Sequence, residues 1–68
     1  MMNLDKLKDE RMKNFFTQHT LAQKLGIGKS SYCRKEKGEV PFTLKDMKIL
    51  KKELNLTIEQ VDDIFFKD

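Results

Sequence analysis

The apolar residues of this 68-residue chain recur every three or four positions, which is the spacing of one face of an α-helix. Signals for β-strands are poor, and the chain contains only two valines, Val40 and Val61. Glycine and proline interrupt the helical pattern at only a few points, namely Gly26, Gly28, Gly38 and Pro41. The pattern therefore predicts an all-α fold of five short helices in a single domain, residues 1–68.

Residues that favour helix ends place the boundaries of the predicted helices. Asn3 is the expected N-cap of the first helix, which runs to about Asn14. Thr17 is the expected N-cap of a second helix, which Gly26 stops. A threonine followed three residues later by a side-chain acceptor forms a capping box, and two such pairs open a fourth and a fifth helix: Thr43 with Asp46, and Thr57 with Gln60.

The segment from about 18 to 37 predicts a helix, a tight turn at 26–28, and a third helix from about Lys29 to just before Gly38. A turn this short makes the two helices cross steeply, as in the DNA-binding helix-turn-helix. Ala22 supplies the small side chain needed at the crossing, and Gly26 tolerates left-handed backbone angles at the bend. The residues expected to hold the pair to the core are Leu21, Leu25, Ile27 and Tyr32. The alternative is an ordinary helical hairpin within a bundle.

The third helix has two different faces at about 100° per residue. One face carries small or basic residues: Lys29, Ser30, Cys33, Arg34 and Lys37. The opposite face carries Ser31, Tyr32 and Lys35. A slim basic face can enter the major groove of duplex DNA and present its side chains to base edges. We therefore interpret the segment 29–37 as a recognition helix.

Charge is distributed unevenly along the chain, although the net charge is only +3. Residues 24–37 hold five basic residues against one acidic residue, a net charge of +4. Residues 55–68 hold four acidic residues against one basic residue, a net charge of −3. This asymmetry favours a polyanionic partner for the middle of the chain, although a solvated charged face is the alternative.

Several classes of protein are excluded by the scarcity of reactive residues. Cys33 is the only cysteine and His19 the only histidine, so we expect no disulfide within the chain and no zinc site. No catalytic constellation surrounds either residue, and we predict no enzyme activity and no cofactor. We interpret Cys33 as a small helix residue, with a redox switch as the alternative. No apolar run approaches the roughly 20 residues of a membrane span, and residues 1–13 lack a signal peptide. We therefore expect a cytoplasmic protein that does not enter a membrane.

The chain resembles the Xre/Cro-like helix-turn-helix family, whose fold is that of the phage lambda-type repressors. The matching residues are Thr17-Gln18, Leu21-Ala22, Lys24-Leu25-Gly26-Ile27, Lys29-Ser30, Tyr32 and Glu36-Lys37-Gly38. The later segments 42–44 and 61–66 are also similar to members from Gram-positive prophages and mobile elements. The resemblance covers about residues 4–66. It implies a sequence-specific transcriptional regulator, a repressor or Cro-like protein, that binds a double-stranded DNA operator.

The resemblance also implies roles for individual positions. Gln18 corresponds to a phosphate contact, and Lys29, Ser30 and Arg34 correspond to base-reading positions, while Lys37, Thr43 and Lys45 would lie near the DNA backbone. The complete set of candidate DNA-binding residues is Gln18, Gly28, Lys29, Ser30, Ser31, Cys33, Arg34, Lys35, Lys37, Thr43 and Lys45.

Three residues depart from the family pattern. Lys35 occupies a position where many relatives have an apolar core residue, so its stem must snorkel or its amine must find Glu36 or DNA. Gly28 is at an N-cap position where serine or asparagine is common. Glu39 replaces a basic residue that often meets phosphate, which leaves the contacts after Gly38 open.

The apolar residues near the carboxyl end suggest how copies of the chain associate. Helical spacing places the phenylalanines in the core, with Phe16 and Phe66 the least certain. Phe66 lies about 100° from Phe65 and cannot fully share its buried face. We expect a homodimer, with Phe66 in the contact. The alternative function is a protein-interaction module of the same fold, an antirepressor or antitoxin, that binds a heterologous repressor or a toxin.

Overall fold

The structure is a computed structural model that describes residues 2–67. The regular secondary structure of this part of the chain is entirely helical, without a β-strand, as predicted. Five α-helices follow one another in sequence: α1 (Leu4–Lys13), α2 (Gln18–Leu25), α3 (Lys29–Glu36), α4 (Leu44–Glu53) and α5 (Ile58–Val61). The last helix continues without a break into a π-helical turn, η1 (Asp62–Phe66).

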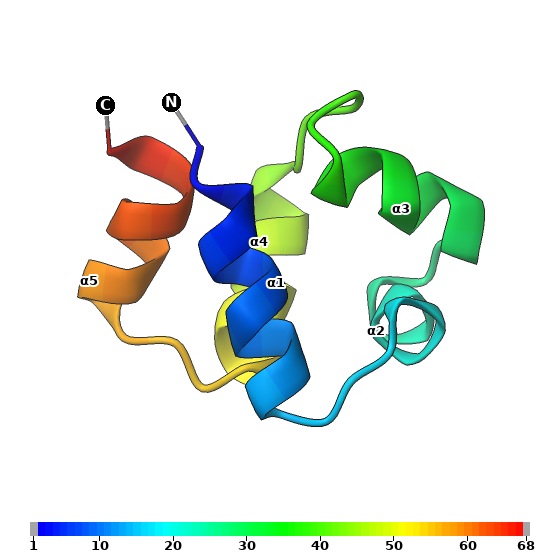
Figure 1. Cartoon of the computed structure of the whole chain (residues 1–68), viewed down its shortest axis with the longest axis horizontal. Helices are drawn as coiled ribbons and strands as arrows, with labels where there is room; N and C mark the ends of the chain where they lie inside the picture. The colour runs from blue at the N-terminus through cyan, green and yellow to red at the C-terminus, as the bar shows by residue number, and fades with distance from the viewer. Residues whose placement is uncertain (1, 68) are drawn as a thin grey trace.

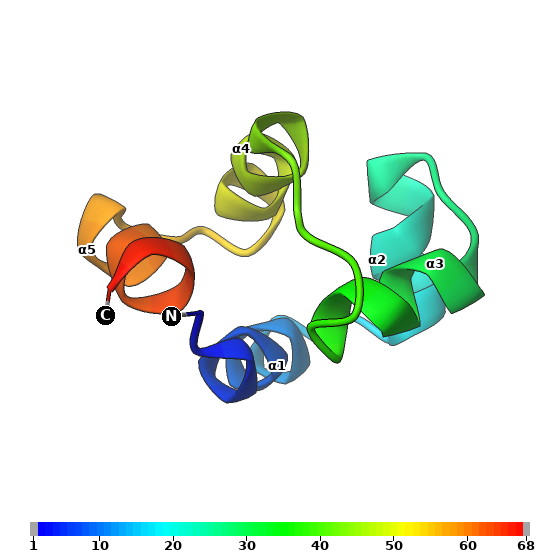
Figure 2. The same cartoon turned by 90° about the horizontal axis from the view of Figure 1, so that it is seen from above.

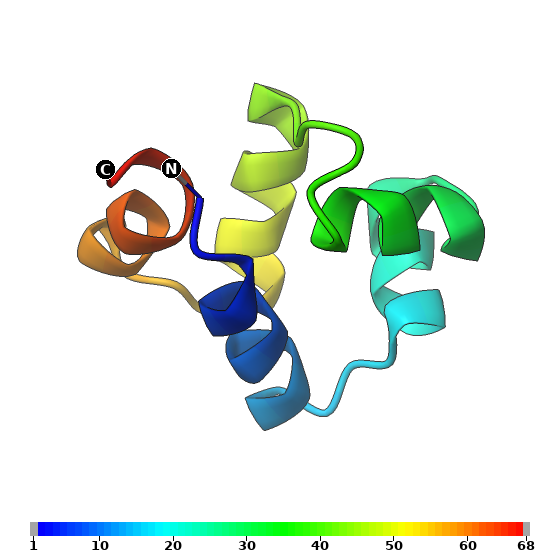
Figure 3. The same cartoon turned by 45° about the horizontal axis from the view of Figure 1, so that its top comes forward.

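Two helices form the centre of the molecule, and the others lie on either side of them. Helices α1 and α4 lie in the middle, α2 and α3 lie on one side, and α5 lies on the other (Figures 1 and 2). The connection between α3 and α4 bends over one end of the molecule (Figure 3). Both ends of the described chain lie together, and the Asn3 N–H donates to the Ile64 carbonyl at 2.7 Å. The α2–α3 pair is therefore displayed on the side remote from the chain ends.

The helices begin at the predicted N-caps. The Asn3 side chain accepts from the Lys6 N–H. Three threonines form capping boxes with the residue three positions later: Thr17 with Thr20, Thr43 with Asp46, and Thr57 with Gln60. These contacts satisfy N–H groups that have no partner within the helix. Local sequence alone therefore sets where these helices start.

Left-handed backbone conformations end four of the helices. The residues with positive φ are Phe15 (63°), Gly26 (73°), Gly38 (87°) and Asn55 (52°). In each case the following N–H donates to the carbonyl five residues earlier, as the Phe16 N–H does to Arg11 at 3.1 Å. This is the Schellman motif. Glycine and asparagine tolerate left-handed angles, whereas a bulky residue such as Phe15 adopts them at a cost in energy.

The core is built from side chains of every α-helix except α5, together with η1 and the connecting loops. Its buried apolar residues are Leu7, Leu21, Ala22, Leu25, Tyr32, Phe42, Leu50, Leu54, Leu56, Ile64 and Phe65. The rings of Phe42 and Phe65 meet edge to face, with centroids 5.6 Å apart. Tyr32 reaches the same cluster, with its ring centroid 6.2 Å from that of Phe42. One aromatic chain thus connects α3 to η1.

The expectation that Phe15 belongs to the core is wrong. Its side chain is 95% exposed, whereas Phe16 packs partly buried against the core. The reason is that α1 ends at Lys13, so the helical spacing no longer applies at Phe15. The left-handed angle at Phe15 turns its ring outward. Phe42 and Phe65 are buried as expected, and Phe66 is 55% exposed.

A buried ion pair connects α1 to α3. The Arg11 Nε and Nη2 atoms donate to the two carboxylate oxygens of Glu36 at 3.0 and 3.2 Å. Arg11 Nη1 donates to the Phe16 carbonyl at 3.0 Å, and the Tyr32 hydroxyl donates to Glu36 at 2.6 Å. Burial, followed by the bond to Glu36, raises the pKa of Tyr32 far above its usual value. Both charges are hydrogen-bonded on several sides, which offsets the cost of removing them from water.

Replacing Phe15 by glycine should stabilise the protein. The left-handed backbone costs a non-glycine residue roughly 1–2 kcal/mol, and glycine loses about 0.5–1 kcal/mol in chain entropy. The exposed ring contributes little burial, so we expect Phe15→Gly to raise the free energy of unfolding by about 0.5–1 kcal/mol. Urea denaturation measures this value. Asn55→Gly is the matched control and should change stability less, and a destabilised Phe15→Gly protein would show that the ring contributes to folding.

Candidate nucleic-acid interface

The α2–α3 pair has the two helices and the short connecting turn that the sequence predicts. Gly26 adopts its left-handed angle directly after α2, and the Ile27 N–H donates to the Ala22 carbonyl at 3.1 Å. Ala22 is 1% exposed, the neighbouring Leu21 is fully buried, and α2 packs against α3. The small side chain allows close approach of the helices, and the short turn fixes their relative direction. The outer face of α3 is therefore held by packing on the inner side.

Five of the candidate DNA-binding residues lie together on the outer side of α3. They line one shallow groove together with Glu39, and they are Lys29, Ser30, Cys33, Arg34 and Lys37. All are exposed except Cys33, which is half-buried. Within residues 2–67, Lys29, Arg34 and Lys37 have no carboxylate within salt-bridge distance. This face thus carries three uncompensated positive charges, with Glu39 as a negative group at its edge.

Gln18, the first residue of α2, connects that helix to α3 through its side chain. Its Nε2 atom donates to Glu36 at 3.2 Å, and its Oε1 atom accepts from the Cys33 thiol at 2.9 Å. The side chain is half-buried and both of its polar ends have partners in α3. Gln18 therefore orders the edge between the two helices, a role that the sequence analysis did not assign to it.

Lys35 does not lie on the outer face of α3: of the expected outcomes, its stem snorkels, and its amine does not bind Glu36. The amine donates to the Asp46 carboxylate, and its nitrogen lies 5.9 Å from the centroid of the Phe42 ring. The side chain is only 12% exposed. Its position on the inward side of α3 directs the long stem across the aromatic core to the start of α4, where a carboxylate compensates the charge.

The remaining candidate residues occupy three different places. Gly28 is the N-cap of α3 with an ordinary extended backbone, and no side chain caps this helix. Ser31 is exposed but is absent from the groove that the other α3 residues line. Thr43 caps α4, and Lys45 is exposed in the first turn of that helix. The structure thus gathers the α3 residues on one face but leaves Ser31 and Lys35 outside it.

The pair formed by Lys35 and Asp46 also explains how α4 is placed against α3. Asp46 accepts from the Thr43 N–H at 3.0 Å while it binds Lys35. Burial alone would raise the pKa of Asp46, but the hydrogen bonds from Lys35 and Thr43 and the charge of Lys35 lower it below its usual value. One carboxylate therefore caps α4 and connects it to α3.

Other kinds of site find no support in the part of the chain that the structure describes. Residues 2–67 contain no group of three histidine, cysteine or acidic side chains that could hold a metal ion. No helix in this range is long and apolar enough to cross a membrane. Comparison with protein-family models, curated protein sequences and solved structures gave no match.

Sequence reasoning missed the buried network beneath α3. Arg11 stands in the apolar spacing of the first predicted helix, and an arginine at such a position signals a buried acidic partner. Glu36 is that partner, four residues after Tyr32 on the same helix. The pairing joins residues 25 positions apart, so helical periodicity could not identify it.

Acid should lower the free energy of unfolding, partly through protonation of Asp46. Its pKa is lowered in the folded state, so its contribution to stability is complete above the unfolded pKa of about 4 and is lost as the pH falls through the folded value. We expect Asp46→Asn to lower the free energy of unfolding at pH 7 by about 1–3 kcal/mol. The difference between this variant and the wild type should shrink below about pH 4 in urea titrations.

Lys35→Met provides the reciprocal control for Asp46. It keeps an apolar stem over Phe42 but removes the positive charge from the carboxylate, so its acid dependence should also be flatter than that of the wild type. An unchanged acid dependence in both variants would show that this pair does not link stability to pH.

Proposed function

We propose that this protein is a sequence-specific regulator of transcription that binds double-stranded DNA through a lambda repressor-like helix-turn-helix. The observation that carries the proposal is the outer face of α3, where three basic side chains without carboxylate partners surround small residues. The resemblance to the Xre/Cro-like family assigns the same helix to the major groove. The protein would act as a repressor or Cro-like regulator, by occupying an operator.

Side-chain chemistry divides the proposed contacts with DNA into two groups. The Arg34 guanidinium has the fork geometry that pairs with the N7 and O6 atoms of guanine, and Lys29 and Ser30 lie beside it. Lys37 and Lys45 would bind phosphates, which positions the protein without specifying sequence. Lys35 has no part in this proposal, because its charge is paired with Asp46.

A dimer would supply the affinity that one short helix does not provide. Specific complexes commonly read two half-sites about one helical turn apart, with the two-fold axis of the protein matching that of the DNA. Phe66 and Ile58 are 55% and 75% exposed, and they belong to the α5–η1 end, across the molecule from α3 (Figure 1). A contact through this end would leave both recognition helices accessible. Sedimentation of the wild type and of Phe66→Ser at micromolar concentrations compares their monomer–dimer equilibria and so tests this contact.

The alternative is a protein-interaction module of the same fold that binds a repressor or a toxin. The exposed Phe66 beside an acidic segment favours this reading, since it offers an apolar contact with charged surroundings. Binding of purified protein to duplex DNA without other proteins separates the two functions.

Binding to duplex DNA should weaken steeply with salt. If the two phosphate-binding lysines, Lys37 and Lys45, each neutralise one phosphate, the slope of log K against log salt should be about −1.8 per protomer, or about −3.6 for a dimer. Lys37→Gln should reduce the magnitude of the slope by about 1, whereas Lys48→Gln, which alters an exposed lysine outside this face, should leave it unchanged. Fluorescence anisotropy over a range of salt concentrations gives the slope. A slope near zero, or no binding at low salt, contradicts the proposal.

Replacing Arg34 and replacing Lys37 should affect DNA binding in different ways. Arg34→Ala should cost about 1–3 kcal/mol on the preferred sequence and remove the preference at one base position. Lys37→Ala should weaken binding to all sequences about equally. Selection of bound sequences from a random duplex pool supplies the preferred site, and titrations then compare it with random DNA. An equal loss on both DNAs for Arg34→Ala would refute its base-reading role.

A further inference from the structure

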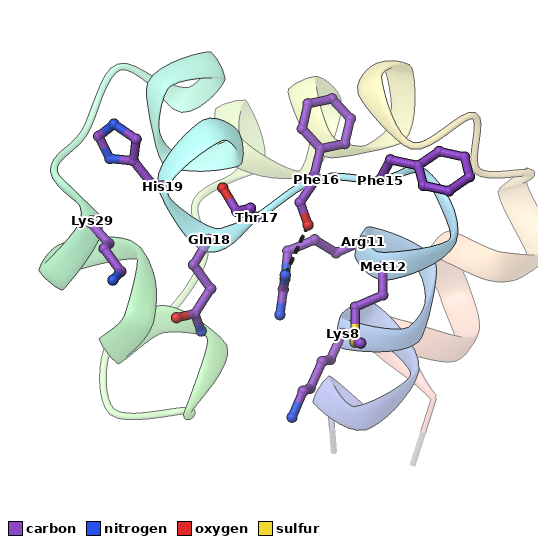
Figure 4. Close-up of a pocket in the computed structure, with 9 residues that line it drawn as sticks. All are labelled: Lys8, Arg11, Met12, Phe15, Phe16, Thr17, Gln18, His19 and Lys29. Atoms are coloured by element: carbon purple, nitrogen blue, oxygen red, sulfur yellow. Dashed lines mark hydrogen bonds between the residues drawn. The ribbon is translucent and has the colours of Figure 1, made fainter.

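A second groove lies between the end of α1 and the start of α2. It has a volume of about 820 Å³, and its lining includes Lys8, Arg11, Met12, Phe15, Gln18 and Lys29. Figure 4 shows Lys8, Arg11 and Gln18 extending toward the same side, with Phe15 projecting from the connection between the helices. The groove shares Gln18 and Lys29 with the proposed DNA-binding residues, so its occupant would meet that interface.

Phe15 is the unusual residue of this groove. Three other helices end on a left-handed residue, and there the chain uses Gly26, Gly38 or Asn55, which tolerate that conformation. At the end of α1 the same turn carries a phenylalanine whose ring is 95% exposed. Backbone strain of this kind is a reason to look for function at the strained position. The ring adds little to the core, so nothing within the described chain offsets the cost of its backbone conformation.

The charge of the groove indicates the chemistry of that molecule. Its lining contains Lys8, Arg11 and Lys29 but no carboxylate among the residues that the structure describes. Arg11 is already paired with Glu36, whereas Lys8 and Lys29 have no salt-bridge partner within residues 2–67. Met12 is 57% exposed and adds a second uncovered apolar side chain to the lining. The groove therefore combines uncovered apolar side chains with uncompensated positive charge.

We propose that this groove binds an acidic segment of another protein that carries a bulky apolar side chain. The apolar side chain would cover Phe15 and Met12, and the carboxylates would pair with Lys8 and Lys29. Because Gln18 and Lys29 belong to both surfaces, the bound segment excludes DNA. This second consequence rests on the proposed DNA-binding function, whereas binding of the segment does not.

Duplex DNA does not match the same combination of features. Its phosphates would pair with Lys8 and Lys29, but its bases are stacked inside the helix and offer no apolar surface at the backbone. Phe15 and Met12 would then stay exposed. Single-stranded DNA could stack an unpaired base on Phe15, so it is an outcome that the experiment must distinguish.

Binding of a labelled synthetic peptide tests the proposal. The probe is a short peptide with two central leucines flanked on both sides by glutamates, and its binding to the full chain is followed by fluorescence anisotropy at low salt. Phe15→Asn removes the ring at a position where asparagine fits the backbone, and we expect it to weaken binding about tenfold. Lys8→Gln should also weaken binding, and added salt should do the same.

Matched controls distinguish this groove from general attraction. Ile58→Asn and Lys48→Gln change an exposed apolar residue and an exposed lysine outside the groove, and both should bind the peptide as the wild type does. Peptides with glutamine for glutamate, or alanine for leucine, should bind more weakly. Absence of peptide binding, or equal losses in the groove and control variants, overturns the proposal. Stronger binding of labelled oligothymidine that depends on Phe15 would overturn it in favour of single-stranded DNA.

Competition with duplex DNA tests the regulatory consequence separately. The peptide should displace wild-type protein from a labelled random-sequence duplex, and Phe15→Asn should bind that duplex normally but resist displacement. Peptide binding without any duplex binding would reject the DNA-binding function and keep the groove assignment. Simultaneous binding of peptide and duplex would overturn the exclusion.

Discussion

The buried pair between Arg11 and Glu36 is the interaction on which the arrangement of α1, α2 and α3 depends. Glu36 accepts from Arg11, from the Tyr32 hydroxyl and from Gln18, which belong to three different helices. A carboxylate in this position must be compensated fully, because an unpaired buried charge is strongly destabilising. Its bonds to Arg11 and Gln18 therefore tie both α1 and α2 to α3. The outer face of α3 is therefore set by a polar network rather than by apolar packing alone.

A second ion pair extends this constraint to α4. Lys35 reaches across the edge of the core to Asp46, and Asp46 also caps α4. The two sides of α3 therefore have different roles. The inward side uses Tyr32, Lys35 and Glu36 to hold the helix. The outward side keeps its positive charges unpaired within the described chain. The division explains how a helix of eight residues can present a basic surface without losing its position in the fold.

Local signals allowed much of the architecture to be predicted from the sequence. Helix starts at Asn3, Thr17, Thr43 and Thr57 depend on side chains only three residues from their targets. The outer face of α3 followed from helical geometry. Prediction was wrong for Phe15, whose ring points outward because the chain leaves the helix before it. The sequence also did not identify Asp46 as the partner of Lys35, or the contacts of Gln18 with α3. These partners are distant in the sequence, and no periodicity within one segment can identify them.

The contact between the two ends of the described chain also determines how the fold can open. The Ile64 carbonyl accepts from the Asn3 N–H, and Lys6 pairs with Asp63, so the start of α1 and η1 hold each other in place. Loosening of either segment therefore removes partners from the other, and the two should open together as one local unit. The α2–α3 pair lies on the other side of the molecule and takes no part in these contacts.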